Sequence, residues 1–189
     1  MLPTLETKRL ILRPINTDDR FDMFEYAKKP NIGPMAGWCP HSSVDETKIV
    51  IEIFINNARR TGLGVFSIIL KENNKMIGTI ELYNRIQNFK AELGYSLNDE
   101  YWGQGIIVEA GEAVLKWGFE QLELYRIQAN IFVFNHQSER VCQKLHMEYE
   151  GLLKNYYLRY DGKVFDCKSY AITREMYQAL KGNNQDEKY

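Results

Sequence analysis

The 189-residue sequence has few cysteines, no long apolar run and almost no net charge. Its three cysteines are far apart and form no C-x-x-C pair, so the sequence predicts neither a disulfide framework nor a zinc knuckle. No stretch approaches the roughly 18 consecutive apolar residues of a membrane-spanning helix. The first residues lack the basic and apolar regions of a secretory signal. We therefore expect a cytoplasmic protein that binds no metal and has no membrane partner.

The charges balance, with 24 Lys and Arg against 25 Asp and Glu. This balance argues against a protein that binds nucleic acid directly through phosphates. Apolar residues make up 44% of the chain, which is enough for one substantial core. At about 150 residues per domain, we expect a single domain over residues 1–181, as a monomer or a homodimer, followed by a disordered polar tail over residues 182–189.

The spacing of apolar residues predicts a sheet with helices on its faces, an α/β or α+β arrangement. Alternating residues predict strands at 8–14, 65–70, 76–82, 91–97 and 126–134, and two final strands joined by a turn at Asp161-Gly162. Helical spacing predicts helices at 16–28, 43–62, 106–122 and 137–145, with a loop at 30–42.

A glycine turn precedes the most strongly predicted helix, in the segment Tyr-Trp-Gly-Gln-Gly-Ile-Ile at residues 101–107. Gly103 and Gly105 have no Cβ, so a ligand can approach the backbone. The first N–H groups of a helix have no internal partner and bind anions such as a diphosphate. The segment is neither a P-loop nor a dinucleotide fingerprint, because no Lys-Ser/Thr follows the glycines and Val108 replaces the third glycine. An anion site and a plain tight turn both stay open here.

Four segments together resemble the GNAT family of N-acetyltransferases, and within it the RimJ/RimL branch that acetylates ribosomal-protein N-termini. They are residues 5–14, 91–97, 100–105 and 135–138, which read LETKRLILRP, AELGYSL, EYWGQG and NHQS. These segments occur in the family order over residues 5 to 177. The resemblance implies a mixed, mostly antiparallel seven-stranded sheet with helices on both faces and a splayed pair of parallel strands. It also implies that acetyl-CoA is the co-substrate and lies in the splay.

The resemblance implies which residues contact the cofactor. The backbone of Tyr95, Ser96 and Leu97 would pair with the pantetheine arm, and Asn135 would reach a pantetheine amide. Trp102 takes the first place of the family's turn pattern, and Ile107 takes the last, where we expect it to make the turn bulkier. The residues implied for the diphosphate turn are Trp102, Gly103, Gln104, Gly105, Ile106 and Ile107.

Acetyl transfer to an amine needs a base for the amine and a proton for the leaving thiolate. Glu92 is the candidate base, because related histone acetyltransferases carry a catalytic glutamate at the matching position. The alternative is that Glu92 is a surface residue, and Glu81 is a weaker candidate. Cys142 stands where many relatives have a tyrosine acid. Ser138, one turn earlier, is the candidate that hydrogen-bonds the CoA sulfur, or else it only helps to cap its helix.

Cys142 is predicted to be a core residue and not a nucleophile, which implies direct transfer without an acyl-enzyme. Trp38 either forms a wall of the acceptor site or packs on its own loop. The leading hypothesis is an acetyl-CoA-dependent N-acetyltransferase that acts on a protein N-terminal α-amine. The alternatives are a small-molecule acceptor, such as a polyamine, antibiotic or amino acid, and a non-catalytic acyl-CoA-binding module.

Overall fold

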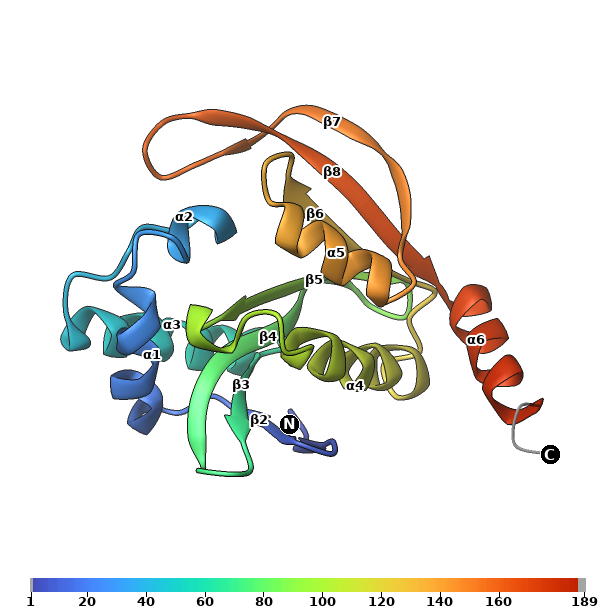
Figure 1. The fold of residues 1–189 in the computed structure, drawn as a ribbon, viewed down its shortest axis with the longest axis horizontal. Coiled ribbons are helices and arrows are strands. Elements are labelled where there is room, and N and C mark those ends of the chain that lie inside the picture. The colour runs from blue at the N-terminus through green and yellow to red at the C-terminus, as the bar shows by residue number, and fades with distance from the viewer. Residues whose placement is uncertain (1, 187–189) are drawn as a thin grey trace.

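An eight-stranded sheet runs through the molecule in the order β1-β2-β3-β4-β5-β6-β8-β7, with helices on both faces (Figure 1). The computed structural model describes residues 2–186. The strands are β1 (Leu5–Glu6), β2 (Leu10–Pro14), β3 (Val65–Leu70), β4 (Lys75–Ile86), β5 (Lys90–Leu97), β6 (Arg126–Phe132), β7 (Glu148–Leu158) and β8 (Val164–Thr173). The helices are α1 (Arg20–Ala27), α2 (Gly33–Ala36), α3 (Val44–Thr61), α4 (Ile106–Glu120), α5 (His136–Lys144) and α6 (Arg174–Asp186).

The expected mixed sheet with helices on both faces is confirmed, with one strand more than the seven expected. The additional strand is β1, which pairs with β2 and has only two residues. Two residues are too few to show an alternating pattern. The short helix α2 lies within the segment expected to be a loop.

The parallel pair β5–β6 separates after a short contact. It begins at Lys90↔Arg126 and ends at Glu92↔Gln128, although β5 continues to Leu97. All other neighbouring strands in the sheet are antiparallel. The sheet therefore opens in its middle, and this splay is the one that the family resemblance implies.

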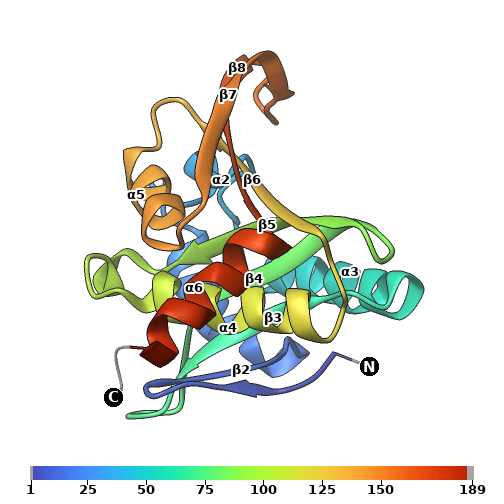
Figure 2. The ribbon, with the colours of Figure 1, turned by 90° about the vertical axis from the view of Figure 1, so that its right-hand side faces the viewer.

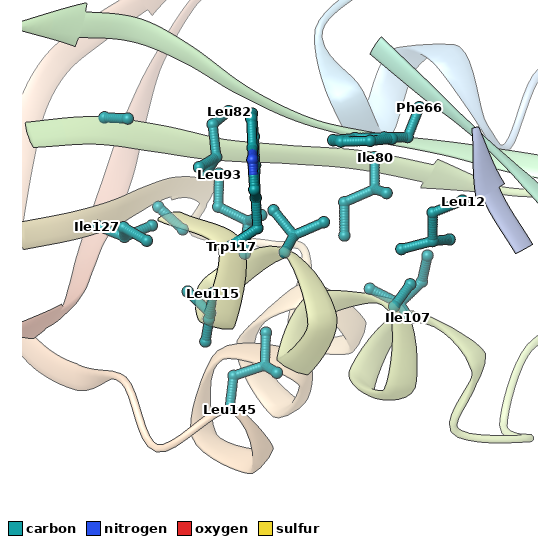
Figure 3. Close-up of a cluster of buried hydrophobic side chains, with 14 of the residues drawn as sticks. Leu12, Phe66, Ile80, Leu82, Leu93, Ile107, Leu115, Trp117, Ile127 and Leu145 are labelled. Atoms are coloured by element: carbon teal, nitrogen blue, oxygen red, sulfur yellow. The ribbon is translucent and has the colours of Figure 1, made fainter. Parts of the chain in front are cut away.

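The two faces of the sheet carry separate cores. On one face α4 packs on the sheet, and Trp117 meets Phe66 edge-on with ring centroids 5.4 Å apart (Figure 3). On the other face α1 and α3 contribute buried residues such as Met23 and Ile51. Because strand side chains alternate, Ile80 on β4 faces the α4 core while its neighbours face the α3 side.

The C-terminal helix α6 was not expected from the sequence. It lies beside α4, where Tyr177 stacks on Phe119 with ring centroids 4.9 Å apart (Figure 2). Met176, Tyr177 and Leu180 share one helical face and pack against the main core. The helix also includes residues 182–186, which belong to the segment expected to be a disordered tail. Residues 187–189 lie outside the described residues.

The β7–β8 hairpin extends over α2 (Figure 1). Tyr157 Oη donates to the Gly37 carbonyl at 3.4 Å, and Arg159 Nη1 donates to the Pro34 carbonyl at 3.3 Å. From α5, Asn135 Nδ2 donates to the Met35 carbonyl at 3.0 Å. These bonds connect α2 to the two elements on the far side of the splay.

Candidate active site

A cavity of about 1020 Å³ lies where β5 and β6 diverge. Its lining comes from both faces of the sheet. The residues on the α4 side include Val108, Val141 and Lys144, and those on the α3 side include Met23, Val50 and Phe54. The cavity therefore passes through the sheet, so two molecules can approach each other from opposite faces.

The structure brings nearly all of the predicted site residues to this cavity. The residues in question are Trp38, Glu92, Tyr95, Ser96, Leu97, Trp102, Gly103, Gly105, Ile106, Ile107, Asn135 and Ser138. Gln104 is the exception. Its side-chain Nε2 donates to the Glu100 carbonyl at 3.2 Å, which accounts for its position outside the cavity lining.

The glycine turn exposes the beginning of α4. Gly103 and Gly105 have φ of 75° and 74°, a left-handed conformation that favours glycine. A Cβ added at Gly103 would meet no atom within 4 Å, so the turn is open. The first intrahelical bond is Glu109 N–H to the Gly105 carbonyl at 3.0 Å, and no side chain caps the helix. The N–H groups of residues 106–108 are thus available to an anion.

Ile107 does not make the turn bulkier, contrary to expectation. Its side chain points into the core, close to Leu12, and is only 7% exposed (Figure 3). The helical position of Ile107 directs its side chain to the sheet, and the residue also lines the cavity. The bulk at this position therefore contributes to the core.

Basic side chains lie near the glycine turn. Arg9 Nη1 donates to the Gln104 carbonyl at 3.0 Å, while its Nε donates to Glu109 at 2.6 Å. Burial alone would raise the pKa of Glu109, but hydrogen bonds from Thr7 and Arg9 outweigh it and lower that pKa. This network fixes the first turn of α4 to the β1–β2 segment.

Sequence analysis missed two further cations, Arg140 and Lys144, which line the cavity from α5. Their i, i+4 spacing places them on one face of the helix. Ser138 and Val141 also line the cavity, so an i, i+3 pattern on a short polar helix was the available signal. Their charge suits the phosphates of an anionic ligand.

The free edge of β5 faces the splay at alternate residues. Asn98 N–H donates to the Ile77 carbonyl on β4 at 2.8 Å, so the backbone groups of Leu97 and Tyr95 point to the opposite edge. Trp102 Nε1 already donates to the Leu97 carbonyl at 3.1 Å. Ser96 has its backbone turned to β4 and its hydroxyl 2.8 Å from that of Thr79. A pantetheine arm would therefore pair with Tyr95 and the Leu97 N–H, not with the Ser96 backbone.

The first turn of α5 lies across the cavity. Asn135 Oδ1 accepts from the Ser138 N–H at 3.1 Å and caps the helix. Because Asn135 Nδ2 also donates to Met35, one amide hydrogen is left for a ligand. Ser138 lines the cavity, and its carbonyl accepts from Tyr95 Oη at 3.3 Å. Ser138 therefore lies both in the first turn of α5 and on the wall of the cavity.

Cys142 is fully buried, as predicted for a core cysteine. Burial raises the pKa of its thiol to about 12, so the thiolate that a nucleophile needs is absent at neutral pH.

Two glutamates stand on the α3 side of the cavity in different surroundings. Glu92 accepts from Asn84 Nδ2 at 3.2 Å and from Asn130 Nδ2 at 3.1 Å. Glu81 lies across from Gly94 on the neighbouring strand. Burial raises the pKa of Glu81 to about 7. Sequence analysis ranked Glu92 above Glu81 without the amides that distinguish the two, because these amides come from β4 and β6.

Trp38 packs on its own loop and also lines the cavity. Its ring packs against Gly33 of its own loop and lies 5.2 Å from the ring of His41. It also lines the cavity and is only half-buried. Burial lowers the pKa of His41, which keeps its imidazole neutral beside the cavity at neutral pH.

Comparisons with known proteins agree with this geometry. Residues 9–148 match the family described as "Acetyltransferase (GNAT) domain". This chain belongs to the GNAT family of acetyltransferases. An uncharacterized N-acetyltransferase, p20 of Bacillus licheniformis, is 30% identical over 178 residues, which cover 93% of this chain and 99% of that protein. The [ribosomal protein uS5]-alanine N-acetyltransferase of Escherichia coli is 26% identical over 179 residues, covering 89% and 90%.

A solved structure of RimL, described as a ribosomal L7/L12 α-N-protein acetyltransferase in complex with coenzyme A, superposes with a TM-score of 0.81. It is 21% identical in sequence and covers 92% of this chain and 99% of that chain. This likeness shows the fold, and the family match shows an acyltransferase. The resemblance to the GNAT family and to its RimJ/RimL branch is therefore confirmed.

GNAT acetyltransferases use acetyl-CoA, and the residues of this GNAT domain fit that group. The open turn at Gly103 leaves room for a diphosphate at free N–H groups, and cations lie on the same side. The opposite side carries the carboxylates Glu81 and Glu92, which suit a cationic amine. Within residues 2–186 no helix is long and apolar enough to cross a bilayer, and no group of three or more potential metal ligands is found.

Proposed function

We propose that this GNAT enzyme transfers an acetyl group from acetyl-CoA directly to the α-amine of a protein N-terminus. The observation that carries the proposal is the cavity through the splay, because it joins the open glycine turn on one face to two carboxylates on the other. The names of the E. coli uS5-alanine acetyltransferase and of RimL support a ribosomal-protein acceptor. A cytoplasmic location and a monomeric or homodimeric state stay predictions.

The α4 side would hold acetyl-CoA. The N–H groups of residues 106–108 would bind the diphosphate, and Arg140 and Lys144 would neutralise phosphate charge. The free backbone groups of Tyr95 and the remaining amide hydrogen of Asn135 would bind the pantetheine arm. These contacts aim the thioester at the splay, where an amine arrives from the α3 side.

Acetyl transfer needs proton movements at two atoms. The acceptor reaches the site as an ammonium and loses one proton to a carboxylate, which is Glu92 or Glu81. Its nitrogen lone pair then attacks the thioester carbonyl, the C–S bond breaks, and the second proton ends on the sulfur. Ser138 is proposed to donate a hydrogen bond to that sulfur, since a serine hydroxyl is a poor outright acid.

A small-molecule amine is the second candidate acceptor. The hydrogen bonds from Tyr157, Arg159 and Asn135 hold α2 across the cavity and favour a small acceptor over a long peptide. A non-catalytic acyl-CoA-binding module is the third candidate, because Cys142 takes the place of the tyrosine acid.

The test is an acetyl-transfer assay with acetyl-CoA and a matched library of peptides and small amines. Release of free CoA together with a mass increase of one acetyl group on the peptide α-amine is expected. Turnover only with polyamines, antibiotics or amino acids would select the second candidate. Binding of acetyl-CoA without turnover on any amine would select the third.

A further inference from the structure

We propose that Glu81 takes the proton from the acceptor ammonium, and that Glu92 is a fixed anion that binds and orients it. This inference rests on the proposed function and assigns separate tasks to the two carboxylates of its acceptor site. It gives the leading role to the residue that the family resemblance does not mark.

The strand register places the two glutamates on one face of the sheet. The pairs Glu81↔Gly94 and Tyr83↔Glu92 are consecutive on that face of β4 and β5. Both glutamates line the cavity on the side opposite the α4 core. A Cβ at Gly94 would lie 3.0 Å from the Tyr83 ring and 3.5 Å from Glu81 Cγ, so the absence of a side chain lets both residues pack directly against β5. Glu81, Tyr83, Glu92 and Gly94 all line the same cavity.

The two carboxylates differ in how many protein groups donate hydrogen bonds to them. Two amides, from Asn84 and Asn130, donate one bond to each oxygen of Glu92. An amide N–H can only donate, so both oxygens of Glu92 are held in place as acceptors. Among the described residues, no group donates to the Glu81 carboxylate, which can therefore gain and lose a proton without breaking a bond. Burial also brings the pKa of Glu81 to about 7, which suits a general base near neutral pH.

The neighbouring ionisable groups do not compete for this role. Burial raises the pKa of the Tyr83 phenol, and the charges of Glu92 and Glu81 raise it further. Burial likewise raises the pKa of Tyr156, on β7, with Glu92 as the next cause. His41 and Glu46 line the cavity from the segment around the start of α3. The Glu46 carboxylate accepts hydrogen bonds from the N–H and the hydroxyl of Ser42. Glu81 is thus the carboxylate in this set without a protein donor.

The proton balance follows from these assignments. The ammonium gives one proton to Glu81, which becomes a neutral carboxylic acid, and the freed lone pair attacks the thioester. The C–S bond breaks, and the second proton of the nitrogen passes to the sulfur. Glu81 then releases its proton to solvent, and Glu92 takes no part in the proton transfers.

The test compares Glu81→Gln with Glu92→Gln in acetyl transfer between about pH 6 and 9, the range around the working pH of a general base. Glu81→Gln is expected to lower kcat by about 10²–10⁴-fold and to abolish the fall in rate at acidic pH. Glu92→Gln is expected to raise the acceptor KM by about tenfold or more and to keep the fall in rate at acidic pH. CoA binding measured by calorimetry should be unchanged in both variants, which shows that they fold.

The opposite pattern would overturn the inference. In that pattern Glu81→Gln keeps the wild-type kcat and the fall in rate at acidic pH, whereas Glu92→Gln loses both. The proposed function would still stand in that case, because wild-type turnover decides it separately. Infrared difference spectra of the wild type and Glu81→Gln provide a readout without any acceptor. A carboxyl band that titrates near neutral pH and is missing from the variant supports the assignment. A Glu81 band that titrates in the ordinary carboxylate range contradicts it.

Discussion

At the scale of single residues, the site depends on what each side chain can still bond to. Ser138 and Cys142 lie one turn apart on α5, yet their surroundings differ. The Ser138 side chain lines the cavity, whereas the Cys142 thiol is completely buried with a raised pKa. The serine is thus placed to contact a ligand, and the cysteine is placed to fill the core.

This contrast predicts opposite phenotypes for two alanine variants. Ser138→Ala should lower kcat by about fivefold, which corresponds to the loss of one neutral hydrogen bond of roughly 1 kcal/mol, with CoA affinity unchanged. Cys142→Ala should keep kcat and lose about 1 kcal/mol of unfolding free energy. Steady-state kinetics and urea unfolding measure both effects. A Cys142→Ala enzyme without turnover but with native stability would restore the acyl-enzyme mechanism that we exclude.

Sequence analysis identified Glu92 but ranked Glu81 below it, and the reason is physical. The family resemblance marks one position on one strand, while the function of a carboxylate depends on its neighbours in space. Asn84 and Asn130 come from two other strands, and only the register brings them to Glu92. Neither the spacing of residues nor a motif contains that information.

At the scale of elements, the beginning of α4 is the part that the sequence predicted best. The helix was expected from residue 106 and begins at Ile106, and β3 has the predicted bounds Val65–Leu70. Strong local signals, glycine turns and apolar periodicity, fix these elements. By contrast, α6 and α2 depend on packing against distant elements, which local signals do not reveal.

The glycine turn offers a matched pair of variants. Gly103 and Gly162 have φ of 75° and 76°, and a Cβ at either would meet nothing within 4 Å. Alanine at each position should cost a similar strain, about 1–2 kcal/mol. Only Gly103→Ala places a methyl group beside the proposed diphosphate, so it alone should weaken CoA binding, by about tenfold.

Calorimetric titration with CoA and thermal unfolding of the two variants check this expectation. Equal CoA affinities in Gly103→Ala and Gly162→Ala, at equal stability, would mean that the turn does not contact the cofactor.

At the scale of the whole molecule, a partly buried ion pair connects β2 to the start of α1. Asp19 accepts from Arg13 at 2.6 Å and from the Ser67 hydroxyl at 2.7 Å. Burial alone would raise the pKa of Asp19, but the bonds from Arg13, Asn16 and Ser67 outweigh it and lower that pKa. Because the pKa of Asp19 is lower in the folded protein than its unfolded value of 3.8, the ionised carboxylate stabilises the folded state at pH values above 3.8. This stabilisation is lost as the pH falls through the folded-state pKa.

We therefore expect Asp19→Asn to lose about 1.5–3 kcal/mol of unfolding free energy at neutral pH, with a smaller loss at acidic pH. Asp18→Asn is the control, because the Asp18 side chain is 95% exposed and lies 3.6 Å from Arg20. It should change stability by less than about 0.5 kcal/mol. Urea unfolding at neutral and acidic pH measures both. A constant difference between Asp19→Asn and the wild type across pH would refute the linkage.

The central claim is that the splayed sheet presents the beginning of α4 to coenzyme A. The most direct measurement is a titration of the isotope-labelled protein with CoA, followed through backbone amide resonances. We predict the largest shifts at the amides of residues 103–108, with further shifts at Tyr95 and Leu97 on the free edge of β5. Saturable binding that leaves these amides unshifted, or no binding at all, would contradict the account.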